Sequence, residues 1–412
     1  MTDPGLTTAA ADAFAALLED THLSQPDELA DVVAEHAATL GLEDLVVYLV
    51  DYEQTALIPV QRRRQPVDQQ VLRIDGTVAG RAFAETTTYE VDAGRAGRRR
   101  LWLPLIDGTD RLGMMELTAP APVTEQLLTY CERYAHLTAQ LIVGKGFYGD
   151  VFELVRRRRP MTVAAELQWT LLPPLVFATR GLVVAGTLEP CYTVGGDSFD
   201  YAVDDSTTRL AVFDAMGHGL AAAVTAAVTV SAYRNARRQR LDLPGTYAAV
   251  DETLRAEFGG ERFATGVLAQ LDLRDGWLRW ISAGHPPPLL LRAGKLVKVL
   301  ELRPSTPLGV PFGQTPVAVG EEQLEPGDRV LLYTDGVVEA RTRTGEFFTA
   351  DRLAEFLERE TADGRPTPET LRRLRHAILA HQNGQLQDDA TALLVEWRRD
   401  TEFALLPETV GP

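Results

Sequence analysis

Short apolar runs separated by turn residues dominate the C-terminal half of the chain and predict a strand-rich domain over residues 181–397. Longer stretches whose apolar residues recur with helical spacing interrupt these runs twice and precede the last run twice more. Two packed sheets with helices outside is the simplest layering for this order of elements. The predicted strands are 182–185, 210–213, 267–273, 278–281, 289–291, 317–319, 330–333 and 392–397, and the predicted helices are 220–237, 246–258, 351–358 and 368–381.

A second pattern, in residues 25–144, predicts a smaller α/β domain. Its order of helix, strand, hairpin and helix, together with the segment 76–83, resembles a GAF domain. That resemblance would imply ligand sensing or dimerisation, and a purely structural dimerisation domain is an equally open interpretation. No ligand-binding residue follows from it. The elements are a helix at 27–40, a strand at 45–50, a strand leading to Gly76 at 71–74, a hairpin formed by 101–106 and 112–117, and a long helix that begins near Val123.

Between these two parts, apolar residues recur every seven positions, which is the spacing of a dimeric coiled coil. The same spacing is also typical of a helix that packs on its own domain and is followed by a separate short helix, so both interpretations stay open. The arginines at 156–159, followed by Pro160, indicate a solvated helix end. The repeat comprises Leu127, Tyr134, Leu141, Tyr148 and Val155, with Gly144, Gly146 and Gly149 as weak points of the helix.

Four short acidic segments lie in order along the strand-rich part, and they carry the candidate chemistry. Four aspartates brought together would repel each other and would not all stay ionised, whereas a bound divalent cation removes that conflict. Ligation by oxygen alone points to Mg²⁺ or Mn²⁺ and not to zinc or a redox metal. The set therefore predicts hydrolysis by a metal-activated water. The segments are Gly195-Gly196-Asp197, Asp214-Ala215-Met216-Gly217-His218-Gly219, Thr334-Asp335-Gly336 and Asp388-Asp389-Ala390-Thr391.

In order and spacing these segments resemble the PPM (PP2C-type) serine/threonine phosphatases of the SpoIIE/RsbU branch, over about 215 residues. The resemblance implies an α+β protein in which a GAF-like sensor and a helical linker precede a β-sandwich flanked by helices (αββα). Further matching motifs are Ser282-Ala283-Gly284-His285-Pro286-Pro287, Pro307-Leu308-Gly309 and Leu324-Glu325-Pro326-Gly327-Asp328. The predicted organisation is an N-terminal segment at 1–24, the GAF-like domain at 25–144, the linker at 145–180, the phosphatase domain at 181–397 and a tail at 398–412.

By this resemblance, two Mn²⁺ or Mg²⁺ ions would be bound, and Asp197 and Asp214 are the candidate catalytic residues. Asp214 would bridge the ions, and the carbonyl group of Ala215 would ligate one of them through water. Asp335 and Asp388 would hold the other ion, and Asp197 would ligate or orient a metal-bound water. Whether Asp388 or Asp389 is the ligand stays open; adjacent residues on an extended segment face opposite ways, so only one should reach the ion, and Asp388 is preferred.

The two histidines near these motifs are not expected to be catalytic. Met216 falls where eukaryotic relatives of the family carry a histidine, and His218 lies two residues beyond it. We therefore expect a structural role at a helix start for His218 and a packed loop position for His285. The stretch 166–173 resembles the helix that precedes the catalytic domain in this branch and switches it, and a burial role is expected for Trp169.

Charge and cysteine content narrow the class of protein further. The net charge of −17 argues against nucleic acid and anionic membrane as partners. The two cysteines, Cys131 and Cys191, are expected to be reduced thiols in a cytoplasmic protein. Neither has an arginine six residues further on, so a cysteinyl-phosphate mechanism lacks its phosphate cradle. The apolar runs are too short for membrane spans.

The expected function is metal-dependent hydrolysis of phosphoserine or phosphothreonine on a regulatory protein, such as an anti-anti-sigma factor. The GAF-like domain, with a small-molecule ligand of its own, would regulate this activity in a homodimer. One alternative is a catalytically silent PPM-fold scaffold that binds a partner. Another is a different metal-dependent signalling enzyme behind a GAF input, such as a nucleotidyl cyclase.

Overall fold

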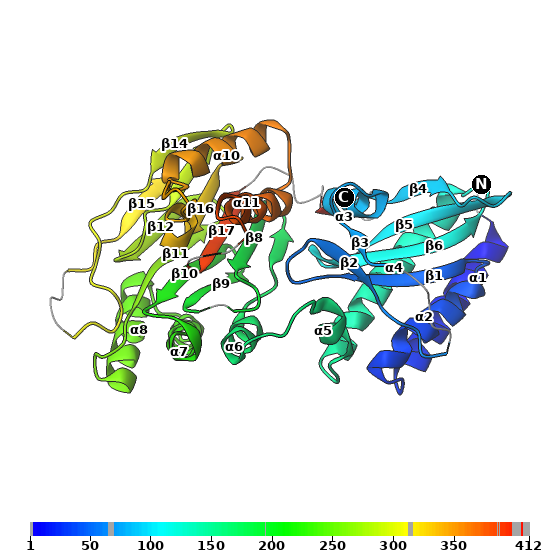
Figure 1. Ribbon diagram of the computed structural model, residues 1–412, viewed down its shortest axis with the longest axis horizontal. Coiled ribbons are helices and arrows are strands. Elements are labelled where there is room, and N and C mark those ends of the chain that lie inside the picture. Colours follow the sequence, from blue (N-terminus) through cyan, green and yellow to red (C-terminus); the bar gives the residue numbers. More distant parts are fainter. Residues whose placement is uncertain are drawn as a thin grey trace. The chain divides into compact units, whose positions relative to one another are not determined.

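In the computed structural model, the chain divides into two compact units, one built on Met1–Arg159 and the other on Pro160–Glu402 (Figure 1). The structure describes residues 3–64, 70–193, 195–311, 316–384, 386, 388–397 and 405–406. Almost all of the tail predicted at 398–412 lies outside these residues. Within the described ranges, no helix combines the length and the apolar character that a membrane span requires.

The first unit is built on a six-stranded antiparallel sheet with the strand order β3-β2-β1-β6-β5-β4. Its side chains alternate between two cores, as the pleat requires. Helices α1, α2 and α4 cover one face, and α3 covers the other (Figure 1). The strands are β1 Glu43–Val50, β2 Ala56–Pro59, β3 Leu72–Arg73, β4 Tyr89–Asp92, β5 Arg98–Asp107 and β6 Asp110–Pro120. The helices are α1 Pro4–Thr21, η1 Pro26–Glu28, α2 Leu29–Ala38, α3 Val78–Glu85, α4 Glu125–Gly146 and α5 Val151–Arg156.

The predicted hairpin forms as expected, because β5 pairs with β6 out to Asp107 and Asp110 at the turn. Helix α1, in the stretch predicted only as an N-terminal segment, packs into the same core through Ala10, Ala13 and Leu17. The compact unit therefore starts before residue 25. Because many of its apolar residues are alanines, the apolar pattern indicates this helix only weakly. The same small side chains allow α1 to pack closely against α2 and α4.

The seven-residue repeat is used inside the first unit. Leu127 and Tyr134 are buried in its core, and Leu141 packs partly buried against the same core. Helix α4 ends at Gly146, and Tyr148 in the following turn is 80% exposed. The structure thus supports the second interpretation left open by the sequence, a helix packed on its own domain and a separate short helix, α5. The described helices contain no continuous four-heptad seam, and the homodimer stays a prediction.

Helix α5 ends at Arg156, and Arg158 and Arg159 beyond it are exposed, which confirms the solvated helix end predicted from the sequence. Arg156 donates a hydrogen bond to the carbonyl oxygen of Val50 at 3.2 Å, and its guanidinium lies 4.6 Å from the centre of the Tyr52 ring. Arg158 and Arg159 form ion pairs with Asp51 and Glu53 in the turn that follows β1. The chain therefore leaves the first unit in contact with this turn.

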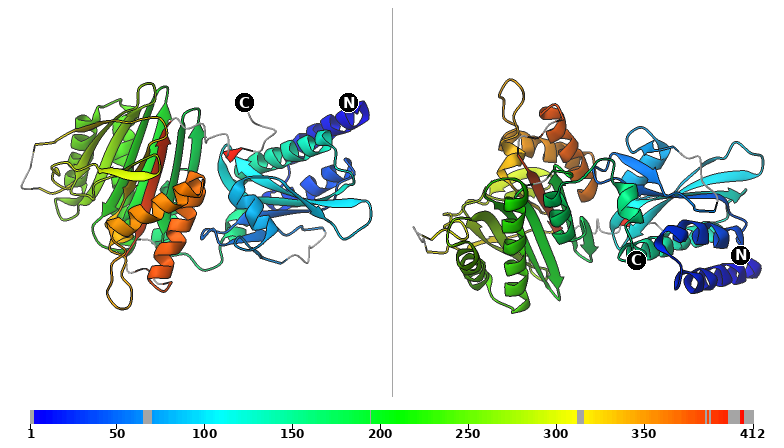
Figure 2. Two further views of the ribbon diagram at one scale, coloured as in Figure 1. Left: turned by 90° about the horizontal axis from the view of Figure 1, so that it is seen from above. Right: turned by 60° about the horizontal axis from the view of Figure 1, so that its bottom comes forward.

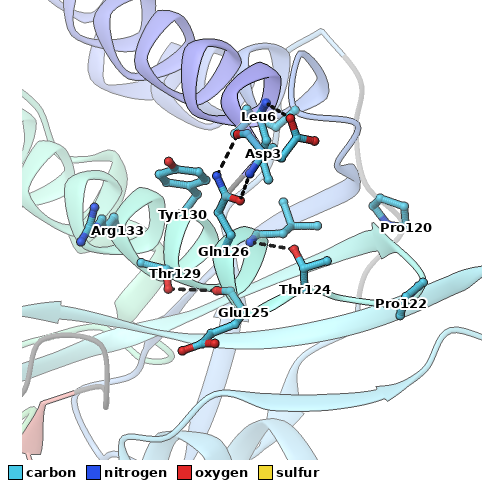
Figure 3. A pocket seen from close by; sticks show the side chains of 12 residues that line it. Asp3, Leu6, Pro120, Pro122, Thr124, Glu125, Gln126, Thr129, Tyr130 and Arg133 are labelled. Carbon is cyan, nitrogen blue, oxygen red and sulfur yellow. Dashed lines mark hydrogen bonds between the residues drawn. The ribbon is translucent and has the colours of Figure 1, made fainter. Parts of the chain in front are cut away.

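A cavity of about 760 Å³ lies in the first unit beside the starts of α1 and α4 (Figure 3). The Gln126 side chain accepts a hydrogen bond from the backbone N–H of Asp3 at 2.7 Å and donates one to the carbonyl oxygen of Asp3 at 3.0 Å. The Tyr130 hydroxyl donates to the Thr7 hydroxyl at 3.1 Å. These polar groups join α4 to α1, so they do not identify a ligand for the cavity, and the sensor ligand stays a prediction.

The second unit consists of two stacked antiparallel sheets with the strand orders β15-β12-β11-β10-β9 and β14-β13-β16-β17-β8-β7. Apolar side chains from both sheets form one core between them. The strands are β7 Val176–Thr179, β8 Leu182–Glu189, β9 Asp197–Asp204, β10 Thr207–Ala215, β11 Ala264–Asp272, β12 Trp277–Ala283, β13 Leu289–Arg292, β14 Lys295–Val299, β15 Gly320–Gln323, β16 Arg329–Tyr333 and β17 Ala390–Trp397.

Helices cover the outer faces of both sheets, which confirms the layering predicted from the apolar pattern. Helices α7 and α8 pack on the five-stranded sheet through a second core, and α6 packs on α7. Helices α10 and α11, orange in Figure 2, lie against the six-stranded sheet that contains the red strand β17. The helices are α6 Val163–Leu171, α7 Gly219–Arg238, α8 Leu243–Phe258, α9 Asp335–Val338, α10 Ala350–Ala362 and α11 Thr367–His381.

One predicted strand is wrong. Residues 317–319 are not a strand, and the chain pairs with β12 only from Gly320 onward, as β15. The apolar pattern missed β15 because it is a polar edge strand with the sequence Gly-Glu-Glu-Gln. It missed β9 because this strand opens with the polar residues Asp197 and Ser198, and Asp200 follows two positions later, yet all three are buried.

Candidate active site

The four acidic segments lie at the ends of two pairs of neighbouring strands, β9 and β10 in one sheet and β16 and β17 in the other. Strand β9 begins at Asp197, and the antiparallel register places this residue directly opposite Asp214 near the end of β10. In the other sheet, Asp335 follows β16, and Asp388 and Asp389 immediately precede β17, the neighbour of β16. The sandwich therefore brings together carboxylates that are up to 192 residues apart in sequence.

Asp197 is held in the interior by the other sheet. Its side chain is almost fully buried, and its Oδ2 accepts a hydrogen bond from the Thr334 hydroxyl at 2.6 Å. The Thr334 oxygen in turn accepts the backbone N–H of Thr391 at 2.9 Å. Thr334 thus links the ends of β16 and β17 to the start of β9. Sequence reasoning assigned no role to this threonine, although it directly precedes Asp335.

The adjacent aspartates Asp388 and Asp389 have different environments. The Oδ2 of Asp389 accepts the backbone N–H groups of Gly195 at 2.6 Å and Gly196 at 2.8 Å. Asp388 is exposed, and its Oδ1 accepts the backbone N–H of Asp389 at 2.9 Å. The two carboxylates thus have different hydrogen-bond partners. Metal ligation by Asp388 stays a prediction.

Two glycines in the acidic segments are required by close backbone approach. A Cβ atom on Gly196 would lie 2.1 Å from the carbonyl oxygen of Ala215. A Cβ atom on Gly336 would lie 1.8 Å from the carbonyl oxygen of Asp389. Any larger residue at either place would push the strand ends apart, since these contacts are with backbone atoms that cannot swing away.

Burial and mutual repulsion raise the pKa values of these carboxyl groups. The pKa of Asp214 rises to about 7, first because it is buried and then because Asp335, Asp388 and Asp389 are near. Burial, Asp214 and Asp389 raise the pKa of Asp197 well above its usual value. Burial and the charge of Asp388 raise the pKa of Asp335. Burial and neighbouring charge thus oppose simultaneous ionisation of Asp197, Asp214 and Asp335.

A divalent cation fits this region in charge and in donor type. Carboxylate oxygens are the ligands that Mg²⁺ and Mn²⁺ prefer, and the positive charge would offset the repulsion that raises the pKa values. The side chains are not drawn into a closed ligand sphere: among the described residues, no group of three or more His, Cys, Asp or Glu side chains converges tightly enough to hold an ion. The candidate ligands all lie at these strand ends: Asp197, Asp214, Ala215, Asp335 and Asp388.

Neither histidine of the motifs is placed as an acid–base group. His218 occupies the N-cap position of α7, but its side chain makes no capping hydrogen bond and is exposed. His285 is 7% exposed, its Nδ1 lies 2.8 Å from the Thr265 hydroxyl oxygen, and burial lowers its pKa to about 4. His285 is thus a packed, neutral loop residue, as expected. Met216, in the loop between β10 and α7, is 40% exposed.

Helix α6 contacts the loop that carries the first acidic segment. The Gln168 side chain is fully buried and donates a hydrogen bond to the carbonyl oxygen of Gly195 at 3.4 Å. The half-buried indole of Trp169 donates to the carbonyl oxygen of Cys191 at 2.8 Å. The sequence predicts burial of Trp169. It does not indicate the contact made by Gln168, because a lone glutamine in a helix is not a recognisable motif. Cys191 and Cys131 are both buried, and neither forms a disulfide bond.

Part of the chain is similar to several known proteins. The model of the family described as Stage II sporulation protein E (SpoIIE) matches residues 204–398. Protein IcfG of Synechocystis sp. is 24% identical over 261 residues, which are 57% of this chain and 40% of that protein. Phosphoserine phosphatase RsbU of Bacillus subtilis is 23% identical over 234 residues, which are 57% of this chain and 68% of RsbU. The crystal structure of the RsbU and RsbW domains of Rv1364c from Mycobacterium tuberculosis superposes with a TM-score of 0.47 and 28% identity over 53% of this chain and 62% of that one.

Proposed function

The second unit is a SpoIIE-type phosphatase domain of the PP2C class, and from this premise we propose that the protein is a metal-dependent serine/threonine phosphatase. Its substrate is a phosphoserine or phosphothreonine residue on a regulatory protein, such as an anti-anti-sigma factor. The proposal rests on one observation: Asp197, Asp214, Asp335 and Asp388 lie near one another at strand ends of the two stacked sheets.

When bound, two Mn²⁺ or Mg²⁺ ions would supply an activated water and positive charge beside the phosphate group. Asp214 would ligate both ions, Asp335 and Asp388 would hold one of them, and the carbonyl group of Ala215 would ligate the other through water. Asp197 would orient the attacking water, and the Thr334 hydroxyl donates a hydrogen bond to its carboxylate at 2.6 Å, which keeps it in place. Because the carboxylates are set at strand ends, the fold positions them before substrate arrives.

The test is release of inorganic phosphate from a panel of phosphoserine-containing regulatory proteins in the presence of Mn²⁺, with a chelator as the control. We expect at least one protein to be dephosphorylated and the chelator to abolish the reaction. A protein that binds Mn²⁺ but releases no phosphate from any of them, or from p-nitrophenyl phosphate, would instead be the catalytically silent scaffold.

We further propose that the first unit, as a GAF-like sensor in a homodimer, regulates this activity through α6. Two observations support this. Helix α6 begins three residues after Pro160, the first residue of the second unit. Gln168 and Trp169 on this helix bind the backbone carbonyl groups of Gly195 and Cys191, in the loop that leads to Asp197. A displacement of α6 would therefore move the start of β9.

Deletion of residues 1–159 is expected to change kcat for the phosphoprotein by about fivefold or more, because coupling between sites typically amounts to this factor. Dimerisation should weaken at the same time. Light scattering and phosphatase assays on the full-length and shortened proteins measure both effects, and circular dichroism confirms that the shortened protein is folded. A full-length protein that is monomeric, with activity unaffected by the deletion, would mean that the two units are merely tethered.

A further inference from the structure

We propose that Asp389 is a positioning residue that fixes the backbone of Gly195-Gly196-Asp197 and is not a metal ligand. Its Oδ2 accepts the N–H groups of two consecutive residues, Gly195 at 2.6 Å and Gly196 at 2.8 Å. The N–H of Asp197 lies at the limit of the same contact, at 3.5 Å. The inference rests on the proposed phosphatase function for its kinetic consequences but not for its structural ones.

The surroundings of Asp389 leave its carboxylate little freedom. A Cβ atom on Gly195 would lie 2.7 Å from Oδ2, so the glycine is what allows the carboxylate to approach the backbone. On the other side, the carbonyl oxygen of Asp389 lies against Gly336, where a Cβ atom would be only 1.8 Å away. Hydrogen bonds from backbone N–H groups to a carboxylate are shorter and stronger than neutral ones, so two such bonds hold the loop firmly.

The consequence concerns Asp197. The Thr334 hydroxyl fixes its side chain, and Asp389 fixes the two residues that precede it. Both groups come from the six-stranded sheet, whereas Asp197 begins β9 of the five-stranded one. Asp389 therefore fixes the start of β9 relative to β17. This keeps the Asp197 carboxylate facing Asp214. The exposed carboxylate of Asp388 instead accepts the backbone N–H of Asp389.

Variants at these two adjacent positions separate positioning from ligation. Asp389→Asn keeps an oxygen that can accept both N–H groups and removes only the charge, so it should retain kcat within about threefold. Asp389→Ala removes the acceptor, and kcat should fall about a hundredfold, the usual effect of a displacement of about 1 Å in a catalytic group. Asp388→Asn, the matched neighbour, should lose activity and need more Mn²⁺. If Asp389→Asn loses activity and Mn²⁺ affinity to the same degree as Asp388→Asn, the proposal is overturned.

A structural measurement decides the matter independently of activity. Amide hydrogen exchange in peptides that contain Gly195 and Gly196 should be faster in Asp389→Ala than in the wild type, and unchanged in Asp389→Asn. If Asp389→Ala does not fold, Gly195→Ala disturbs the same contact from the loop side and should also speed exchange. Unchanged exchange in the folded variant would refute the positioning role. An inactive wild-type protein with the expected exchange pattern would refute the phosphatase function alone.

Discussion

Asp214→Asn is expected to lower kcat for phosphoprotein hydrolysis at least about a hundredfold. The residue lies near the end of β10, directly opposite Asp197, and burial together with three neighbouring aspartates raises its pKa to about 7. An ionised carboxylate with this environment is stabilised only if positive charge lies beside it, which is the role proposed for the two ions. The asparagine has nearly the same shape but carries no charge, so the two ions would lose their shared ligand.

The measurement is kcat at saturating substrate over a range of Mn²⁺ concentrations. Asp204→Asn is the matched control, because Asp204 is an exposed aspartate at the other end of β9. It should behave like the wild type. Near-normal activity of Asp214→Asn that also resists a chelator would rule out the two-metal mechanism.

The second large effect is expected for Asp335→Ala, together with almost none for His218→Ala. Asp335 lies two residues after the end of β16, and its pKa is raised by burial and by the charge of Asp388, so it shares the electrostatic field of the proposed ions. His218 caps no helix through its side chain and is exposed at the start of α7. We expect Asp335→Ala to lower kcat about a hundredfold or more, whereas His218→Ala should keep most of the activity.

The two variants are compared at the same Mn²⁺ concentration, with circular dichroism to show that both are folded. The pH profile of His218→Ala should match that of the wild type, because no acid–base step is assigned to the imidazole. Equal and severe losses in both variants would show instead that His218 takes part in the chemistry.

Much of the second unit could be predicted from local pattern alone. Runs such as 210–213 and 392–397 are apolar because both faces of these strands are covered, by the partner sheet and by helices, and this leaves a direct trace in the sequence. The order of the acidic segments could also be recognised from the sequence, since three of the four follow or precede such a run. The polar strands could not be recognised from the apolar pattern. Strand β15 pairs with β12 through its backbone, and β9 buries its aspartates only because residues from other parts of the chain surround them.

The sequence by itself determined which segments could be strands, helices and turns, and which residue types could bind a cation. Only the tertiary structure decided between equivalent patterns. The repeat through Leu127 and Tyr134 is the same for a coiled coil and for a packed helix, and the first unit's own core used it. Asp388 and Asp389 are identical neighbours in sequence, and only the approach of Gly195 and Gly196, more than 190 residues away, distinguishes them. Periodicity records that a face is buried but not which partner buries it, because the partner is chosen when distant strands pair and the sheets close on each other.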